Sequence, residues 1–342
     1  MNENFTVIEL FAGAGGLALG LERAGLKNIL AVEVDKYAAA TLNKNRPNWN
    51  VLHDDVANID YEGIQADVVA GGFPCQAFSY AGKKLGFEDT RGTLFFEFAR
   101  CIKEVKPKMF IGENVEGLLR HEKGKTLSVM IEVLSELGYK VQYKVLNAAF
   151  YGVPQKRKRL FIIGTLPGYN FLFPDPESKM TTLRSWLSNV PKSEGVSYPD
   201  WKKKIMEMVP PGGCWVNLPE DIQKSYLGKS YHSGGGKRGM ARRLSFDEPS
   251  LTLTTSPHQK QTERCHPVET RPLTVREYAR IQTFPDNWKF VGSVSSQYKQ
   301  IGNAVPVLLA EQVGVAVMRA LQGVTTQMHV QRTLEVFSAQ LN

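Results

Sequence analysis

The sequence predicts an α/β protein with a doubly wound, mostly parallel sheet and a second, smaller, irregular domain. Short apolar runs alternate with segments of helical periodicity over the first 165 residues, a pattern typical of repeated βα units. A glycine-rich turn follows the first apolar run, at the place where such sheets bind ligands. After about residue 167, prolines and glycines multiply and only short β-prone pieces remain.

The predicted strands of the first domain are short runs rich in Val, Ile, Leu and Phe. They lie at residues 6–11, 28–33, 68–70, 109–112 and 159–164. Helices are expected at about 16–25 and 36–45, and a third helical pattern joins Leu94, Phe98, Ile102 and Val105. Cys101 shares that face, so it is predicted to be a core residue.

Changes in composition and in hydrophobic periodicity predict four segments along the chain. Residues 1–167 form the first domain and residues 168–270 the irregular second one. Helical patterning returns at 271–323, which is expected to rejoin the first domain. The tail at 324–342 has no assignment.

Composition and charge narrow the function classes. The 342 residues carry a net charge of +8, with a pI near 9.2, which suits a polyanionic partner. Basic side chains cluster at 156–159, 202–204 and 242–243. An ordinary solvated surface explains the last two clusters equally well.

Cysteine usage and hydropathy indicate a cytoplasmic protein. The four cysteines are scattered and form no C-x-x-C pair, so neither a disulfide framework nor a metal site is expected. The N-terminus lacks the basic and apolar regions of a signal peptide. No run of about eighteen uncharged apolar residues occurs, and we therefore expect no membrane span.

The glycine-rich turn and two acidic positions predict an adenosine-shaped site. Gly13, Gly15 and Gly16 lie between the first strand and its helix, where glycines let the backbone approach a ligand. Glu33 ends the second strand twenty residues after Gly13, the usual distance for a carboxylate that binds a ribose hydroxyl. Asp54 and Asp55 follow a further strand, expected between the second run and the run at 68–70, where a carboxylate can accept from an exocyclic amine. A dinucleotide and S-adenosylmethionine remain open alternatives from these residues alone.

Cys75 is the most informative single residue. It follows Pro74 directly after the apolar stretch 67–70, and loops after strands carry the chemistry of open α/β sheets. Glu113 ends the strand at 109–112, so it should emerge at the same sheet edge. The alternatives are a buried structural cysteine for Cys75 and a structural ion pair with arginine for Glu113.

A thiol and a carboxyl facing one pocket suit attack on an electron-poor ring such as cytosine. The thiolate adds at C6 while the acid protonates or hydrogen-bonds N3, and C5 then becomes nucleophilic. The reference pKa values are about 8.5 for Cys and 4.3 for Glu. The site must therefore lower the first pKa with cationic neighbours and raise the second by burial. Arg157 and Arg159 are the candidate cations.

Together these features resemble the cytosine-C5 DNA methyltransferases, particularly the compact enzymes of restriction–modification systems. The resemblance extends from about residue 5 to residue 322 and rests on six motifs in a fixed order. They are Phe-x-Gly-x-Gly-Gly at 11–16, Pro-Cys-Gln at 74–76, Glu-Asn-Val at 113–115, Gln-Lys-Arg-Lys-Arg at 155–159, Arg-Pro-Leu-Thr-Val-Arg-Glu-Tyr-Ala-Arg at 271–280 and Gln-Tyr-Lys-Gln-Ile-Gly-Asn-Ala-Val-Pro at 297–306.

The resemblance implies a Rossmann-like fold, S-adenosylmethionine as methyl donor and a role for each motif. Cys75 would be the nucleophile, Glu113 would engage N3 and the amino group, and Arg159 would hold O2 with help from Arg157. The cofactor would contact Phe11, Gly13, Gly15, Gly16, Glu33, Val34, Asp55, Val56, Leu94 and Asn303. Val34 departs from the aromatic residue that several relatives carry there, so affinity for the cofactor is expected to be lower.

The resemblance also implies double-stranded DNA as the partner. The target cytosine must be flipped out of the duplex, at a cost of a few kcal/mol. Segment 77–91 resembles the loop that closes on DNA, and 168–270 matches the target-recognition domain by position. The predicted DNA contacts are Ser79, Lys83, Arg91, Thr252, Gln259 and Arg264. We expect a monomer that works beside a separate cognate restriction endonuclease.

Four other functions compete with this interpretation. A non-catalytic DNA-binding relative is the first, and the presence of both Cys75 and Glu113 argues against it. An NAD-dependent oxidoreductase would use the glycine-rich turn but does not require Pro-Cys-Gln or Glu-Asn-Val. A zinc deaminase needs Pro-Cys-x-x-Cys, and Phe78 occupies the second cysteine position. A tRNA cytosine-C5 methyltransferase of the same fold is the main alternative, although the Cys-Phe-Thr element usual in that group is absent here.

Overall fold

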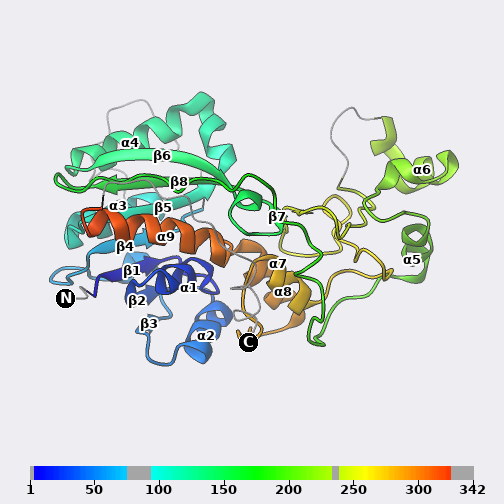
Figure 1. The fold of residues 1–342 in the computed structure, drawn as a ribbon, viewed down its shortest axis with the longest axis horizontal. Coiled ribbons are helices and arrows are strands. Elements are labelled where there is room, and N and C mark those ends of the chain that lie inside the picture. Colours follow the sequence, from blue (N-terminus) through cyan, green and yellow to red (C-terminus); the bar gives the residue numbers. More distant parts are fainter. Residues whose placement is uncertain (1–3, 75–93, 233–238, 325–342) are drawn as a thin grey trace. The chain divides into compact units, whose positions relative to one another are not determined.

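The computed structural model describes residues 4–74, 94–232 and 239–324, which divide into two compact units (Figure 1). Unit 1 takes residues 1–147, 158–176 and 307–331, and unit 2 takes 148–157, 177–306 and 332–342. The structure therefore divides residues 271–323 between the units, because the chain returns to unit 1 only at Val307. The functional division at 167 and 270 stays a prediction.

Unit 1 is built on a seven-stranded sheet with the strand order β3-β2-β1-β4-β5-β8-β6. β1 to β5 pair in parallel, whereas β8 runs antiparallel to both β5 and β6. Its strands are β1 (Thr6–Leu10), β2 (Lys27–Val32), β3 (Val51–Leu52), β4 (Val68–Gly71), β5 (Met109–Val115), β6 (Lys140–Asn147) and β8 (Lys158–Thr165). The predicted α/β class with a mostly parallel sheet is confirmed.

Helices lie on both faces of this sheet, as doubly wound topology requires. They are α1 (Gly16–Arg23), α2 (Lys36–Asn45), α3 (Leu94–Val105), α4 (Lys125–Glu136) and α9 (Val307–Leu321), with 3₁₀ turns η1 (Val56–Asn58) and η2 (Glu116–Gly124). Ile8 and Leu10 of β1 join the apolar core under α3 and α4. The Glu9 carboxyl between them accepts a hydrogen bond from the Ala18 amide of α1. Since side chains alternate along a strand, α1 covers the opposite face.

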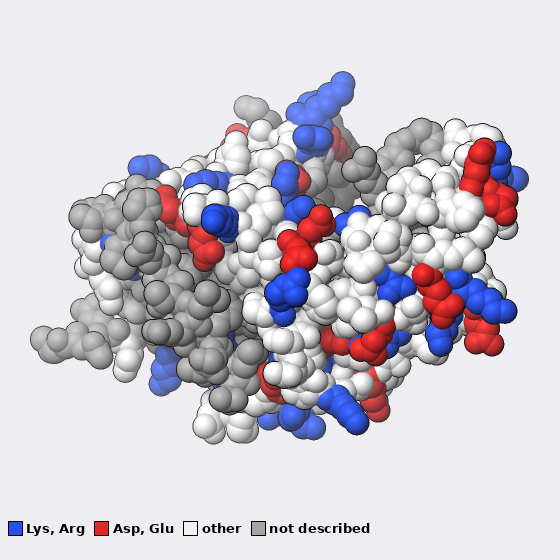
Figure 2. Space-filling view, turned by 45° about the vertical axis from the view of Figure 1, so that its right-hand side comes forward, with Lys and Arg blue, Asp and Glu red and all other residues white. Residues whose placement is uncertain are grey.

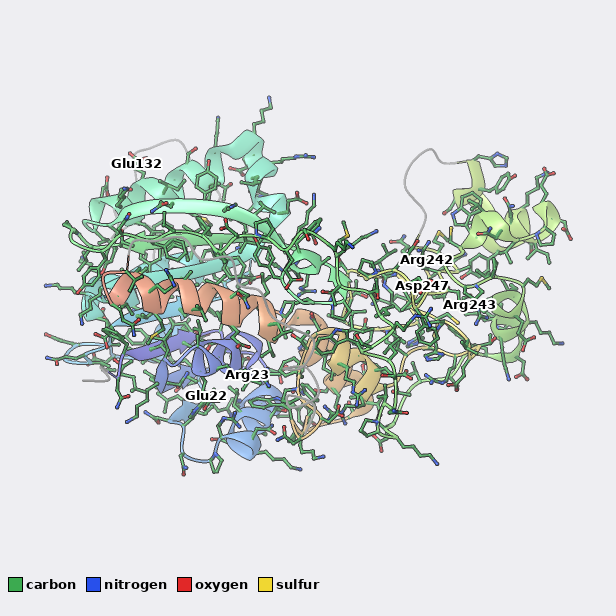
Figure 3. The ribbon with its side chains drawn as sticks, viewed as in Figure 1. Glu22, Arg23, Glu132, Arg242, Arg243 and Asp247 are labelled. Carbon is green, nitrogen blue, oxygen red and sulfur yellow. The ribbon has the colours of Figure 1, made fainter. Side chains whose placement is uncertain are left out.

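The C-terminal helix α9 completes unit 1 by packing on α1. A β-carbon on Gly20 would lie 2.4 Å from Cβ of Ala310, so only glycine allows this approach. Arg23 pairs with Glu311 at 3.9 Å across the same contact (Figure 3 labels Arg23).

The stretch Val294–Leu321 is long and apolar enough to cross a membrane, but 83% of its apolar window is buried, as in a core helix.

Unit 2 is mostly irregular, in keeping with its prolines and glycines. Its elements are η3 (Ala148–Phe150), β7 (Gln155–Lys156), α5 (Asp200–Glu207), η4 (Trp215–Asn217), α6 (Glu220–Leu227), η5 (Gly228–His232), β9 (Ser250–Leu251), α7 (Val275–Ile281) and α8 (Val294–Asn303). β7 and β9 form a parallel two-stranded sheet. α7 begins with a capping box in which Thr274 and Glu277 exchange hydrogen bonds.

Candidate active site

The carboxyl ends of β4 and β5 bring the segment before Cys75 against Glu113. Gly71 pairs with Gly112 in the parallel ladder, which places Gly72 beside Glu113. A β-carbon on Gly72 would lie 3.0 Å from Oε2 of Glu113. Asn114 Nδ2 donates to the Phe73 carbonyl at 2.8 Å. Cys75, Ser79, Lys83 and Arg91 lie outside the described residues.

Glu113 forms an ion pair with Arg159 of β8. The Arg159 Nε lies 2.8 Å from Glu113 Oε1, and the two side chains are 13% and 12% exposed. The antiparallel ladder pairs Val115 with Arg159 and Glu113 with Phe161, so Glu113 and Arg159 are diagonal neighbours on one sheet face. Burial lowers the pKa of Arg159 while Glu113 opposes that shift. The predicted acid and its predicted cation therefore meet within unit 1.

Arg157 lies in unit 2 and holds backbone segments together. Its guanidinium is almost fully buried and donates to the carbonyls of Leu253 at 3.2 Å, Gly302 at 3.0 Å and Asn303 at 3.3 Å. A β-carbon on Gly302 would lie 2.1 Å from the Thr254 carbonyl oxygen, so these backbones touch. Arg157 thus positions this part of unit 2, and its catalytic role stays a prediction.

The glycine-rich turn between β1 and α1 is tied directly to Glu33. The Gly13 amide donates to Glu33 Oε2 and the Asp35 amide to Glu33 Oε1, each at 2.7 Å. Phe11, Gly13 and Gly15 have positive φ values of 57°, 56° and 86°, and a β-carbon at Gly13 would meet nothing within 4 Å. The turn is therefore an open backbone cradle beside a fixed carboxylate. Gly16 is the first residue of α1.

The remaining predicted cofactor residues come after this turn in the sequence. Their side chains differ in exposure to solvent. Val34 is 65% exposed, directly after Glu33. Asp55 is exposed and accepts from the Ala57 amide at 3.0 Å, whereas Val56 is buried. Leu94 is half-buried at the start of α3. Asn303 ends α8 in unit 2.

Glu9 is a buried acid next to the glycine-rich turn. Sequence reasoning did not single out this residue. Burial raises its pKa well above the usual range, the Ala18 amide lowers it, and the charge of Glu33 raises it. A carboxyl in the middle of the apolar run 6–11 was the available signal, because an uncompensated charge is costly in such a strand.

A model of the C-5 cytosine-specific DNA methylases matches residues 5–319 of this chain. The chain belongs to this family. Among its relatives, the Type II methyltransferase M.Eco47II of Escherichia coli is 59% identical over 334 residues, covering 94% of this chain and 80% of the relative. The Type II methyltransferase M.Sau96I of Staphylococcus aureus is 55% identical over 331 residues, covering 94% and 77%.

Solved structures share the fold of this DNA methylase. The methyltransferase EhMeth of Entamoeba histolytica superposes with a TM-score of 0.65 at 17% identity, covering 95% of this chain and all of that one. The Dnmt2 methyltransferase of S. pombe gives a TM-score of 0.60 at 17% identity, covering 94% and all of that chain.

The residues of the methylase predicted to contact DNA differ in accessibility. Gln259 is exposed. Thr252 donates through Oγ1 to the Lys156 carbonyl at 2.7 Å. Arg264 is buried, and its guanidinium donates to the carbonyls of Thr252 and Glu263 at 2.6 Å each. Burial lowers the pKa of Arg264 to about 10. Their contacts with DNA stay predictions.

The basic clusters of the methylase are only partly solvated. Lys203 and Lys204 are exposed, but Lys202, which precedes them on α5, is buried. Arg243 is buried among loops of unit 2 (Figure 3), where it donates to the Met206 and Val209 carbonyls. On the face drawn in Figure 2, basic side chains lie interspersed with acidic ones. Among the described residues, no group of three or more His, Cys, Asp or Glu could hold a metal ion.

Gly72→Ala is expected to slow the methylase by up to about tenfold in single turnover. The new methyl group would press on Oε2 of Glu113, and because that carboxylate is the flexible partner, it would move from its position. A contact of 3.0 Å moves its neighbour by a few tenths of an ångström, and a misplacement of about 1 Å can cost 10²-fold, so a smaller loss is expected here. Quenched-flow methyl transfer with saturating DNA measures the effect.

Gly117→Ala is the matched control for Gly72→Ala, since its nearest neighbour would lie 3.9 Å away. Combining Gly72→Ala with Glu113→Asp tests the cause, because the shorter acid retreats from the methyl group. The two effects should then be less than multiplicative. A normal rate for Gly72→Ala would contradict this role for Gly72.

Proposed function

We propose that this chain is a DNA (cytosine-5-)-methyltransferase of a Type II restriction–modification system that methylates a flipped cytosine in duplex DNA. The observation that carries the proposal is the close approach of Gly72, three residues before Cys75, to Glu113, which pairs with Arg159. The next residue, Phe73, accepts a hydrogen bond from Asn114 through its carbonyl. Both contacts occur in a chain of the C-5 cytosine-specific DNA methylase family. This edge of the sheet thus carries the Arg159 cation, the Glu113 acid and the backbone that precedes Cys75 in the sequence.

Each group at this edge has a defined task in the proposed reaction. The Cys75 thiolate forms a bond to C6 of the cytosine while Glu113 hydrogen-bonds or protonates N3, and electron density moves to C5. Arg159 holds O2 and stabilises the charge that develops there. Once C5 carries its methyl group, a base such as water takes the C5 proton, and the C5–H electron pair re-forms the C5–C6 double bond and expels Cys75 as its thiolate. N3 returns any proton that it took to Glu113, which restores the ring and the acid.

S-adenosylmethionine, when bound, would supply an electrophilic methyl group to this site. The donor set supports this choice: the open cradle at Gly13 admits a ligand close to the backbone. Glu33 is held in place by two backbone amides, so its carboxylate is preorganised to accept from ribose hydroxyls. Phe11, Val34, Asp55, Val56 and Leu94 would contact the rest of the cofactor from unit 1, and Gly15 and Gly16 would let α1 begin beside it.

Glu33→Gln is expected to weaken S-adenosylmethionine binding by about 10- to 100-fold. Hydrogen bonds to a charged group contribute about 1.5–3 kcal/mol, and the amide cannot accept both ribose bonds and the two backbone bonds. Isothermal titration calorimetry measures the affinity. Glu62→Gln, an exposed acid of the same unit, should bind normally. Equal affinities for both variants would remove Glu33 from the cofactor site.

The proposal extends to the organisation of the chain and its partners. Residues 168–270 would read the DNA sequence, and 271–323 would return the chain to the catalytic domain. The enzyme would act as a monomer in the cytoplasm, beside a separate restriction endonuclease. Its kinship with Type II methyltransferases supports the place in a restriction–modification system.

Methyl transfer to competing nucleic acids tests the proposed function. The purified chain is incubated with labelled S-adenosylmethionine and either a duplex library of random sequence or total tRNA, and bisulfite sequencing locates the product. We expect 5-methylcytosine at one short sequence in duplex DNA and none in tRNA. The tRNA alternative is not favoured by the relatives, which are Type II methyltransferases. Methylation of tRNA alone would overturn the proposal.

A further inference from the structure

Lys202 is a buried cation inside unit 2. It is one of three consecutive lysines on α5, yet its side chain is only 8% exposed. Its ammonium lies 2.5 Å from Glu263 Oε1 and donates to the His258 carbonyl at 3.1 Å. It also lies 5.1 Å from the centre of the Tyr198 ring. Lys202 therefore cannot serve as a phosphate contact in this conformation, unlike the exposed Lys203.

Glu263 is the partner that brings separate segments of unit 2 together. Its side chain is fully buried, and Tyr226 of α6 donates to Oε2 at 3.1 Å. The Glu263 amide donates to the Gly239 carbonyl at 3.0 Å. The pair lies against an apolar cluster that includes Tyr198, Met206 and Cys265. One ion pair thus joins α5, α6 and the segment that leads to Arg264.

The loop at 255–262 is closed at its base and held from inside by Lys202. The hydroxyls of Thr254 and Thr262 share a hydrogen bond of 3.1 Å, and the Arg264 amide donates to the Pro257 carbonyl at 2.8 Å. Four consecutive polar residues of the loop, 258–261, are exposed. The bond from Lys202 to His258 fixes the backbone where this exposed stretch begins.

The physical cost of this pair indicates a role other than stability. Burying two charges costs several kcal/mol per ion, and apolar replacements of a whole buried pair are often neutral or stabilising. A buried pair whose cation also bonds a loop carbonyl fixes the position of that loop. The exposed stretch carries Gln259 and Gln261, whose amides can donate and accept in the pattern that base edges present.

We propose that Lys202 is a positioning residue for sequence recognition. Through Glu263 and the His258 carbonyl, it holds the 255–262 loop in the register in which its polar side chains read the DNA target. This inference rests on the proposed function, because it assumes that the chain methylates a defined duplex sequence.

The double variant K202M/E263Q tests the inference while avoiding an unpaired buried charge. Methionine keeps the apolar stem of Lys202, and glutamine can still accept from Tyr226, but the bond to His258 is lost. Each variant methylates a duplex library of random sequence, and bisulfite sequencing gives the ratio of methylation at the preferred site to that at single-substitution sites. Since one mismatch in typical recognition lowers affinity by about tenfold or more, we expect this ratio to fall about tenfold.

K203M is the matched control, because it removes the neighbouring exposed lysine and should keep the ratio. The melting temperature of K202M/E263Q is expected to stay near that of the parent chain. An unchanged ratio would overturn the inference. A melting temperature far below that of the parent would overturn it too, because the ion pair would then serve mainly to stabilise the fold. A parent chain that methylates no duplex DNA would instead overturn the proposed function, and this inference with it.

Discussion

Cys75→Ala is expected to abolish methyl transfer to DNA while S-adenosylmethionine binding stays measurable. Without the sulfur no bond forms at C6, so C5 of cytosine never becomes nucleophilic. Removal of a catalytic nucleophile typically costs on the order of 10⁴-fold or more. The measurement is single-turnover transfer of a labelled methyl group to duplex DNA, with calorimetry for cofactor binding.

Cys101→Ala is the matched control for the nucleophile. Cys101 is a fully buried residue of α3, where burial raises the pKa of its thiol, so it cannot supply a thiolate. This variant should keep methyl transfer despite a small loss of stability. Retained turnover in Cys75→Ala would remove Cys75 from the role of nucleophile.

Glu113→Gln is expected to lower the single-turnover rate by about 10²- to 10⁴-fold, the usual contribution of a positioned acid or base. That range corresponds to roughly 3–5 kcal/mol of transition-state stabilisation. Glutamine has nearly the same shape, and it can still accept from Arg159 Nε, which lies 2.8 Å from the native carboxylate. It cannot, however, exchange a proton with N3.

Glu116→Gln is the corresponding control. Glu116 is an acid three residues further on, paired at the surface with Lys158 at 3.0 Å, and surface pairs of this kind contribute little. Its variant should react at the normal rate. If Glu113→Gln also reacted normally, the ion pair with Arg159 would be purely structural.

Much of unit 1 could be predicted because its strands are buried on both faces. β4 and the centre of β8 read as continuous apolar runs, and in the run that forms β1 only Glu9 interrupts the apolar residues, as expected for central strands. β6 was missed although Val141, Tyr143 and Val145 alternate with polar residues. It is an edge strand with a mostly half-exposed or exposed pattern, so its apolar signal is weaker.

Only the part of the candidate site that follows from sheet topology could be predicted. Strand ends that share an edge bring Gly72 and Glu113 together, and parallel pairing of β4 with β5 follows from the βα order. The burial of Arg157, Lys202 and Arg264 could not be predicted. The partners of Arg157 and Lys202 lie far away in sequence, for example 96 residues from Arg157 to Leu253. Arg264 bonds the nearer carbonyls of Glu263 and Thr252, but nothing in the sequence shows that its side chain turns inward. Runs of basic residues give no signal that separates a buried cation from a solvated one.

A covalent trap tests the central claim most directly. Duplex DNA that carries 5-fluorocytosine at the methylated position blocks the last step, because fluorine cannot leave as the C5 proton does. With S-adenosylmethionine present, the account predicts a protein–DNA conjugate that survives denaturation, with the DNA attached at Cys75 by mass spectrometry. If a duplex whose unmodified form is methylated gave no conjugate, or one attached at another residue, the account would be contradicted.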